Sequence, residues 1–231
     1  MTSKADKLLK KALQQLKIEG KSSEKKFNNI YKLMSELDNL NKVERFSVST
    51  TGTISERICG WALDAALPDG YFRNTSNEDK WLGDYILLGA PFNVVISVKS
   101  YKAKERLLVS GSGSLLVPTI GWGLFDDPDE WKYERLKNYL YRGFIAIYMP
   151  KDTLKELKDD SRNLENTHKK IFLRPIENLV SDIKDESNIS ESDEILAKND
   201  DLLYRSNAPK WFESEDILEI TTEMENDKLL P

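Results

Sequence analysis

The chain has 231 residues, of which 39% are hydrophobic and 32% charged, enough to bury a core as one compact domain with additions or as two small domains. No stretch approaches the roughly 18 apolar residues of a membrane span, and the N-terminal segment lacks the apolar centre of a signal peptide. The single cysteine, Cys59, excludes an internal disulfide, so we expect a protein of the reducing cytoplasm.

The single histidine, His168, narrows the chemistry further. One histidine and one cysteine exclude a zinc cluster built from these residue types, and also nucleases built on paired histidines. His168 lies in a polar run, which favours an ordinary surface position. A metal site in this chain must therefore use oxygen ligands, which magnesium, manganese and calcium prefer.

The net charge of -5 is unevenly distributed along the chain. Residues 181–231 carry five basic and fifteen acidic side chains, a net charge of -10, which leaves +5 on residues 1–180. A basic body fits the binding of a polyanion, although the same charge is also compatible with an ordinary solvated surface. We expect an N-terminal helical subdomain at 1–45, a core at 46–180 and an acidic C-terminal segment at 181–231.

Two amphipathic helices are predicted at the N-terminus. The first is capped by Ser3 and ends before Gly20; its apolar positions recur at helical spacing at Leu8, Leu9, Ala12, Leu13 and Leu16. The second is capped by Ser22 or Ser23, and its apolar positions are Phe27, Ile30, Met34 and Leu37. These helices are expected to pack on the main domain or on a second subunit; the break at Gly20 disfavours a coiled coil.

A third helix is predicted to precede the sheet. Residues 45–49 read as an extended piece and 50–52 as a loop, and the helix begins at Thr53 and ends near Leu67. Pro68, Asp69 and Gly70 then predict a turn, and the polar residues 71–83 a loop.

The clearest β-strand signal is a pair of apolar runs, Asp84–Leu88 and Asn93–Tyr101. The four residues 89–92 separate these runs, which predicts a β-hairpin. If Leu88 pairs with Asn93, the register places Asp84 opposite Ser97.

Lys99 is the unusual residue of the second strand. Side chains alternate between the two faces of a strand, so Val94, Ile96 and Val98 share one face, and Lys99 shares the other with Val95 and Ser97. A lysine on an apolar strand is unfavourable unless it is paired or reaches solvent in a cleft. The carboxylate of Asp84, expected on the neighbouring strand, is the partner it requires.

The rest of the chain predicts further alternation of helices and strands. In order, we expect a polar, Gly- and Ser-rich stretch at 102–114, a segment rich in aromatic and turn residues at 120–131, a helix at Glu134–Tyr141, a buried strand at Gly143–Met149, and helices at 152–163 and 175–183.

Asp84 with the triplet Ser97-Val98-Lys99 resembles the active site of the PD-(D/E)xK nuclease superfamily, to which most type II restriction enzymes belong. In that family an aspartate begins one strand and a (D/E)-x-K triplet ends the next. The carboxylates hold a magnesium ion, and the lysine positions the attacking water. The resemblance covers roughly residues 46–150. It implies an α/β fold, restriction-endonuclease-like, with a mixed central sheet flanked by helices and an N-terminal helical extension.

Two positions depart from the family pattern. Gly83 replaces the proline before the aspartate, and Ser97 replaces the acidic member of the triplet. Some restriction enzymes of this kind instead take a glutamate from the preceding helix, and Glu56 stands at the corresponding place. An alternative role for Glu56 is in a capping box with Thr53, in which the glutamate bonds back to the helix backbone.

The resemblance implies a Mg2+-dependent type II restriction endonuclease that hydrolyses double-stranded DNA at a short specific site as a homodimer. Glu56, Asp84 and the backbone carbonyl of Val98 are the expected metal ligands, Lys99 orients the water, and Ser97 hydrogen-bonds a coordinated water. Asp84→Ala or Lys99→Ala is expected to abolish cleavage and to spare DNA binding. The expected DNA contacts are Lys102, Lys104, Arg106, Ser110 and Ser112 after the hairpin, and Ser49, Thr50 and Thr51 before the helix.

Three other functions remain compatible with the sequence. The first is a repair or mobile-element nuclease of the same superfamily. The second is a non-catalytic DNA-binding or scaffold module on a decayed nuclease fold, which the loss of the triplet carboxylate at Ser97 favours. The third is a helical interaction protein without a nucleic-acid role, in which Asp84 and Lys99 would lie far apart.

Overall fold

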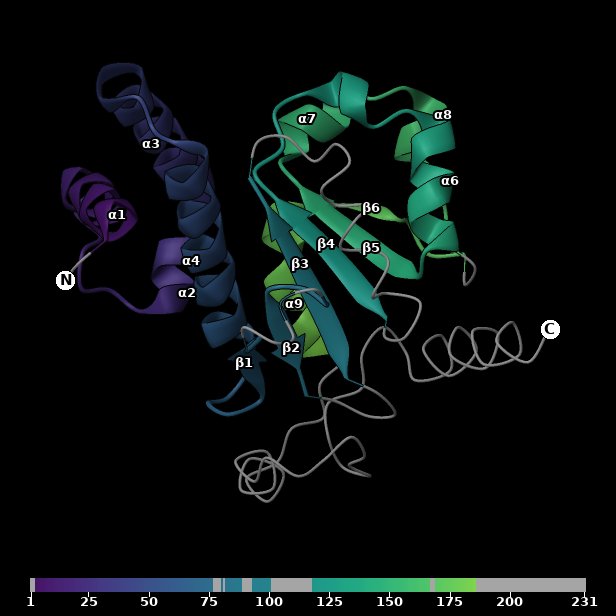
Figure 1. Ribbon diagram of the computed structural model, residues 1–231, viewed down its shortest axis with the longest axis horizontal. Coiled ribbons are helices and arrows are strands. Elements are labelled where there is room, and N and C mark those ends of the chain that lie inside the picture. The colour runs from purple at the N-terminus through teal and green to yellow at the C-terminus, as the bar shows by residue number, and fades with distance from the viewer. Residues whose placement is uncertain are drawn as a thin grey trace.

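The centre of the molecule is a mixed β-sheet flanked by helices, which confirms the expected α/β class (Figure 1). The computed structural model describes residues 3–76, 80, 82–88, 93–100, 118–166 and 169–185. Within these residues, six strands follow one another across the sheet in chain order: β1 (Phe72–Asn74), β2 (Tyr85–Leu87), β3 (Val94–Lys99), β4 (Thr119–Gly123), β5 (Phe144–Met149) and β6 (Leu173–Pro175). Strands β1 to β3 are antiparallel, and β3 to β6 are parallel.

The hairpin of β2 and β3 has the register predicted from the sequence. Tyr85 lies opposite Ile96, and Leu87 lies opposite Val94. The backbone N–H of Asp84 also donates to the carbonyl of Ile96 at 2.8 Å, which extends the pairing beyond β2. The predicted connection 89–92 lies outside the described residues. Asp84 and Lys99 therefore meet at the open end of the hairpin.

The N-terminal half of the chain is helical. Helix α1 (Lys4–Gln15) begins at the predicted cap, where Ser3 Oγ accepts from the N–H of Asp6. The second predicted helix is divided into α2 (Ser23–Phe27), capped by Ser22, and α3 (Ile30–Glu44). At the break, the side-chain amide of Asn29 donates to the carbonyl of Lys25, a side-chain bond of the kind that competes with helix continuation.

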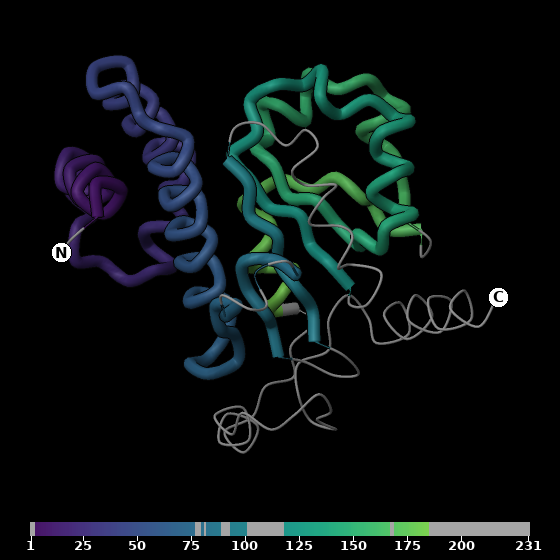
Figure 2. Tube along the Cα trace, in the orientation of Figure 1, coloured from purple at the N-terminus to yellow at the C-terminus, as the bar shows by residue number. Residues whose placement is uncertain are grey.

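Helix α4 (Val48–Ala66) joins the N-terminal helices to the sheet. Its apolar positions share one buried cluster with α1, α3 and the Val94, Ile96 and Val98 face of β3. Figure 2 shows the purple and blue tube of α1 to α4 gathered along one side of the sheet. Polar contacts add to this packing: Tyr31 of α3 donates to Glu177, and Lys184 lies 3.4 Å from Glu24. Residues 3–45 thus share a core with the sheet.

The two faces of the sheet carry different cores. Ala146 and Tyr148 of β5 belong to the cluster beneath α4 and α9 (Leu179–Asp185), whereas Ile147 and Met149 belong to a second, aromatic-rich cluster. The second cluster is covered by α6 (Tyr133–Tyr141) and α7 (Lys151–Glu156), with α8 (Asp159–Arg162) beside α6. The central strands β3, β4 and β5 are therefore buried on both sides, as is usual for parallel strands.

Several sequence predictions of secondary structure are wrong. Residues 72–74 form β1 within the predicted loop 71–83, and the helix predicted at 152–163 is interrupted at Leu157, which is extended. Before α9, residues 173–178 form β6 and the 3-10 helix η2 (Ile176–Asn178). Of the acidic segment 181–231, only 181–185 are described, as the end of α9.

The most consequential error is β4, most of which lies in the segment 120–131 that was predicted to be rich in aromatic and turn residues. Gly121 and Gly123 belong to that segment, but both are buried in the strand. A Cβ at Gly121 would lie 3.0 Å from the Ile147 side chain, and one at Gly123 would lie 2.5 Å from the carbonyl oxygen of Lys99. These glycines permit close packing of neighbouring strands. Irregular backbone follows β4 at residues 124–127, before the 3-10 helix η1 (Pro128–Glu130).

Two further findings concern the single cysteine and the single histidine, which limit the kinds of metal site that the chain can form. Cys59 is a free, fully buried thiol of α4, and His168 lies outside the described residues. In the described part of the chain, no helix combines the length and apolar character of a membrane span.

Candidate active site

Helix α4 begins earlier than the sequence predicted, which changes the meaning of Glu56. Its cap is Ser47, whose Oγ accepts from the N–H of Thr50 at 3.2 Å. The predicted loop 50–52 is therefore helical, and Thr53 lies inside the helix instead of capping it. Glu56 sits in the helix interior, where backbone N–H groups bond to carbonyls one turn earlier. The capping-box role of Glu56 is excluded.

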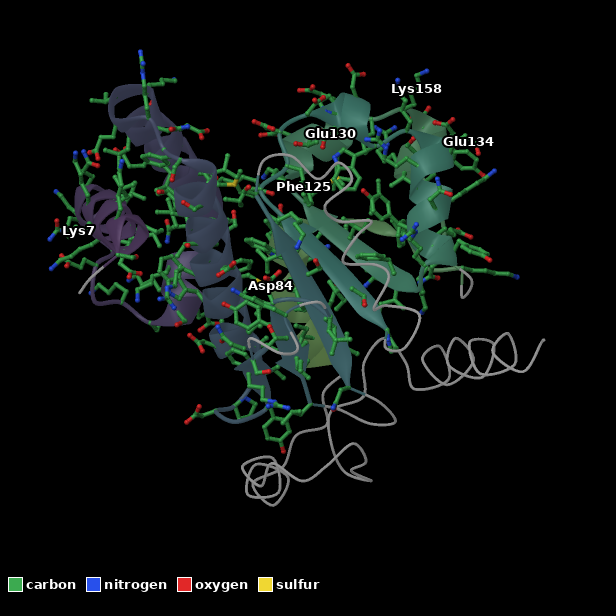
Figure 3. All side chains as sticks on the ribbon, in the orientation of Figure 1. Lys7, Asp84, Phe125, Glu130, Glu134 and Lys158 are labelled. Atoms are coloured by element: carbon green, nitrogen blue, oxygen red, sulfur yellow. The ribbon has the colours of Figure 1, made fainter. Side chains whose placement is uncertain are left out.

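Asp84 and Lys99 form a mostly buried ion pair at the open end of the hairpin. Lys99 Nζ lies 3.6 Å from Asp84 Oδ2, and the two side chains are 15% and 16% exposed. The same Asp84 oxygen accepts from the backbone N–H of Val98 at 2.6 Å. Figure 3 shows the labelled Asp84 between helix α4 and the hairpin. The aspartate thus holds both the β3 backbone and the lysine.

The ammonium of Lys99 is surrounded by oxygen atoms from its own strand. Nζ donates to Ser97 Oγ at 2.9 Å and to the carbonyl oxygen of Val98 at 3.0 Å. Ser97 is fully buried. Three oxygens, one each from Asp84, Ser97 and Val98, therefore converge on one positively charged group. We call these three atoms the oxygen cage.

Glu56 of helix α4 interacts electrostatically with the same ion pair. Burial and then the negative charge of Asp84 raise the pKa of Glu56, while the positive charges of Lys80, Lys99 and Arg57 act in the opposite direction. The hydroxyl of Tyr85, the residue after Asp84, donates to the backbone carbonyl of Glu56 at 2.8 Å, so this turn of α4 lies against the hairpin. Asp84 and Lys99 are thus in contact, and Glu56 stands on the turn of α4 that packs beside them.

Replacing Glu56 by glutamine is expected to stabilise the metal-free protein at neutral pH. A carboxyl with a raised pKa holds its proton more tightly in the folded state, so the folded state loses stability as pH rises from the ordinary value through the raised one. Glutamine resembles the protonated form and removes that loss. Urea unfolding should show Glu56→Gln more stable than wild type at about pH 7.5 and equal to it near about pH 4. Equal stability at both pH values would contradict the shift.

Two further residues of the site carried no recognisable sequence signal. Lys80 lies in the segment predicted to be a polar loop, yet its charge acts on Glu56. Tyr85 was assigned only to the apolar run, but its hydroxyl donates to the backbone carbonyl of Glu56 at 2.8 Å. The hydrogen bond of Tyr85 and the electrostatic influence of Lys80 both join segments distant in sequence, so a local pattern does not reveal them.

Gly83, which stands where the family pattern has a proline, has a structural explanation. A Cβ at this position would lie 2.3 Å from Val95 Cγ1 and 2.8 Å from the carbonyl oxygen of Ile96. Proline and every other residue carry a Cβ, so none of them fits without displacing β3. The backbone before Asp84 therefore approaches β3 more closely than a proline allows.

Gly83→Ala is accordingly expected to destabilise the protein by about 1–3 kcal/mol, the usual penalty for overpacking. The matched control is Gly52→Ala in α4, where a Cβ meets nothing within 4 Å. Since alanine favours helix over glycine, the control is expected to raise the free energy of unfolding by up to about 1 kcal/mol. Urea denaturation of both variants measures the difference, and equal effects of the same sign would refute the packing argument.

The predicted DNA contacts are only partly visible. Lys102, Lys104, Arg106, Ser110 and Ser112 lie outside the described residues. In the first turn of α4, Ser49 is exposed, whereas Thr50 is buried with its hydroxyl 2.8 Å from Ser47 Oγ. Thr51 is half-buried and donates to the carbonyl of Val48. These three residues thus lie in the first turn of a helix, and of the three only Ser49 is exposed.

The residues at the site are compatible with a hard divalent cation. Among the described residues, no three His, Cys, Asp or Glu side chains form a metal-binding group, so an ion would rely on two carboxylates, a backbone carbonyl and water. The Lys99 ammonium demonstrates that the oxygen cage accommodates positive charge. Glu56 adds a second carboxylate beside it.

Comparisons with known proteins identify no relative. No family model matches the chain, and neither a curated protein nor a solved structure matches it. Inference about function therefore depends on the geometry of the site.

Proposed function

We propose that this chain is a magnesium-dependent endonuclease of the PD-(D/E)xK type, specifically a type II restriction endonuclease that cleaves double-stranded DNA at a short site as a homodimer. The observation that carries the proposal is the Asp84–Lys99 pair at the open end of a hairpin with the predicted register. Glu56 on the preceding helix supports it, because its carboxylate interacts electrostatically with that pair.

The oxygen ligands fit the proposed cofactor. Asp84 and Glu56 contribute negative charge, and the Val98 carbonyl contributes a neutral oxygen on the same side of the hairpin. When bound, magnesium supplies Lewis-acid activation of the scissile phosphate and of water. Burial and then the negative charge of Asp84 raise the pKa of Glu56, and a divalent cation at this place would offset the repulsion between the two acids.

Three residues of this chain would have the remaining roles in binding and orienting the reacting groups. Lys99, held by Ser97 and Val98, can orient the attacking water and offset negative charge that develops on the phosphate. Ser97 is completely buried and fixes the direction of the lysine side chain. Asp84, through its bond to the Val98 N–H, keeps the end of β3 and the ammonium in register.

Incubation with plasmid DNA tests the proposal. With Mg2+ a restriction enzyme yields discrete fragments, and EDTA abolishes them. A smear identifies a non-specific nuclease of the same superfamily. Intact plasmid in Mg2+, together with DNA binding in a gel-shift assay, identifies a non-catalytic module and contradicts the nuclease.

One observation favours that non-catalytic DNA-binding module as the second candidate. The Lys99 ammonium already occupies the oxygen cage, so the charges of the hairpin are compensated without any metal ion. In such a module the pair would serve to stabilise the end of the hairpin. The cation affinity of the site, measured directly, distinguishes the two candidates.

A further inference from the structure

A contact between helix α4 and strand β2 links the two carboxylate residues of the site. The hydroxyl of Tyr85 donates to the backbone carbonyl of Glu56 at 2.8 Å. Tyr85 directly follows Asp84 in the chain, and Glu56 is the helix residue whose carboxylate interacts electrostatically with Asp84. This hydrogen bond therefore connects the backbone of Glu56 to Tyr85, the residue that follows Asp84.

The helix leaves room for this bond at one position. A Cβ at Gly60, one turn beyond Glu56, would lie 2.9 Å from the Tyr85 hydroxyl oxygen and 3.7 Å from the ring carbon that carries it. Any larger residue at 60 would push the hydroxyl away from the Glu56 carbonyl. Glycine inside a helix is unfavourable relative to alanine, so its presence here calls for a local reason. The close approach of the Tyr85 hydroxyl to Gly60 supplies that reason.

The hydroxyl of Tyr85 is suited to act as a permanent donor. The residue is only 4% exposed, and its hydroxyl donates to the Glu56 carbonyl. The Glu56 carbonyl has two lone pairs, and the regular helix bond uses one of them. Tyr85 can thus bond to α4 without breaking the helix.

We propose that Tyr85, seated against Gly60, is a positioning residue that sets the spacing between the Glu56 and Asp84 carboxylates and thereby the affinity of the site for a divalent cation. This inference rests on the proposed function, because it assigns the two carboxylates a shared ion. Tyr85 touches neither the ion nor the substrate; it acts through the position of helix α4 against the hairpin.

The test measures Mn2+ binding by the EPR signal of the free ion, without DNA and without cleavage. Tyr85→Phe removes only the hydroxyl and is expected to weaken Mn2+ binding about tenfold, the usual effect of losing a contact that orients a ligand. The matched control is Tyr139→Phe, since the buried Tyr139 hydroxyl has no hydrogen-bond partner among the described residues. The control is expected to bind Mn2+ like wild type.

Combination with Gly60→Ala separates positioning from stability. Alone, Gly60→Ala is expected to lower the melting temperature and to weaken Mn2+ binding, because its methyl group displaces the Tyr85 hydroxyl. In the double variant Gly60→Ala/Tyr85→Phe, the methyl group fills the space of the missing hydroxyl. The melting temperature should then recover, whereas Mn2+ binding should stay about tenfold weaker. Recovery of both quantities together would show a purely structural role and overturn the proposal.

The outcomes also separate this inference from the proposed function. If Glu56→Gln weakens Mn2+ binding and Tyr85→Phe does not, the positioning role is wrong and the metal site stands. If wild type neither binds Mn2+ nor cuts DNA, the proposed function fails. Amide hydrogen exchange at residues 56–60 then still tests whether the Tyr85 hydroxyl holds this turn of α4 in place. Faster exchange in Tyr85→Phe supports that role, and unchanged exchange overturns it.

Discussion

Asp84→Asn is expected to lower the rate of magnesium-dependent DNA cleavage about a thousandfold or more, equivalent to about 4 kcal/mol of transition-state stabilisation. The substitution removes the negative charge but keeps an oxygen that can accept from the Val98 N–H. The hairpin should therefore stay paired while the site loses one of its two carboxylates. Single-turnover cleavage, with DNA binding measured separately by gel shift, gives the comparison.

The alanine variant provides the structural control. Asp84→Ala also leaves the Val98 N–H without its acceptor and Lys99 without its carboxylate partner. It should be less stable than Asp84→Asn by about 1–3 kcal/mol, the penalty for an unsatisfied buried group. Cleavage by Asp84→Asn at the wild-type rate would show that Asp84 has no role in catalysis, whatever the result for the alanine variant.

The parts of the fold that were predicted correctly depend on local periodicity. The Ser3 cap of α1 and the strand β5 follow from patterns contained in a few neighbouring residues. The register of β2 and β3 was also predictable, because a one-residue shift would move the apolar face of β3 away from α4. The start of α4 was missed because Ser47, Thr50 and Thr53 are all plausible caps, and only packing selects one.

The errors arise where distant segments decide the conformation. Gly121 and Gly123 signal a turn locally, but the space between β3 and β5 requires residues without side chains there. The residues of the candidate site show the same difference between local and long-range signals. Asp84 and Lys99 follow from strand alternation, whereas the hydrogen bond of Tyr85 to Glu56 and the electrostatic influence of Lys80 on Glu56 exist only in the folded chain.

Lys99→Met is expected to change catalysis and metal binding in opposite directions. Cleavage should fall about a thousandfold or more, because the ammonium that orients the water is gone. Mn2+ affinity without DNA should rise about fivefold or more, because a unit positive charge no longer competes for the oxygen cage. At a few ångströms such a charge is worth about 1 kcal/mol or more. Methionine keeps the length of the side chain, so the largely buried stem of Lys99 is replaced.

Two lysine controls isolate the charge from its position. Lys99→Arg keeps the positive charge and should keep the low Mn2+ affinity, although its planar fork is not expected to restore cleavage. Lys80→Met removes an exposed lysine that acts on Glu56 electrostatically, and its effect on Mn2+ affinity should be smaller. If Lys99→Met binds Mn2+ no better than wild type, the ammonium and the cation do not share the cage. In that case the ion pair serves only to stabilise the end of the hairpin, which is the arrangement expected of a non-catalytic module.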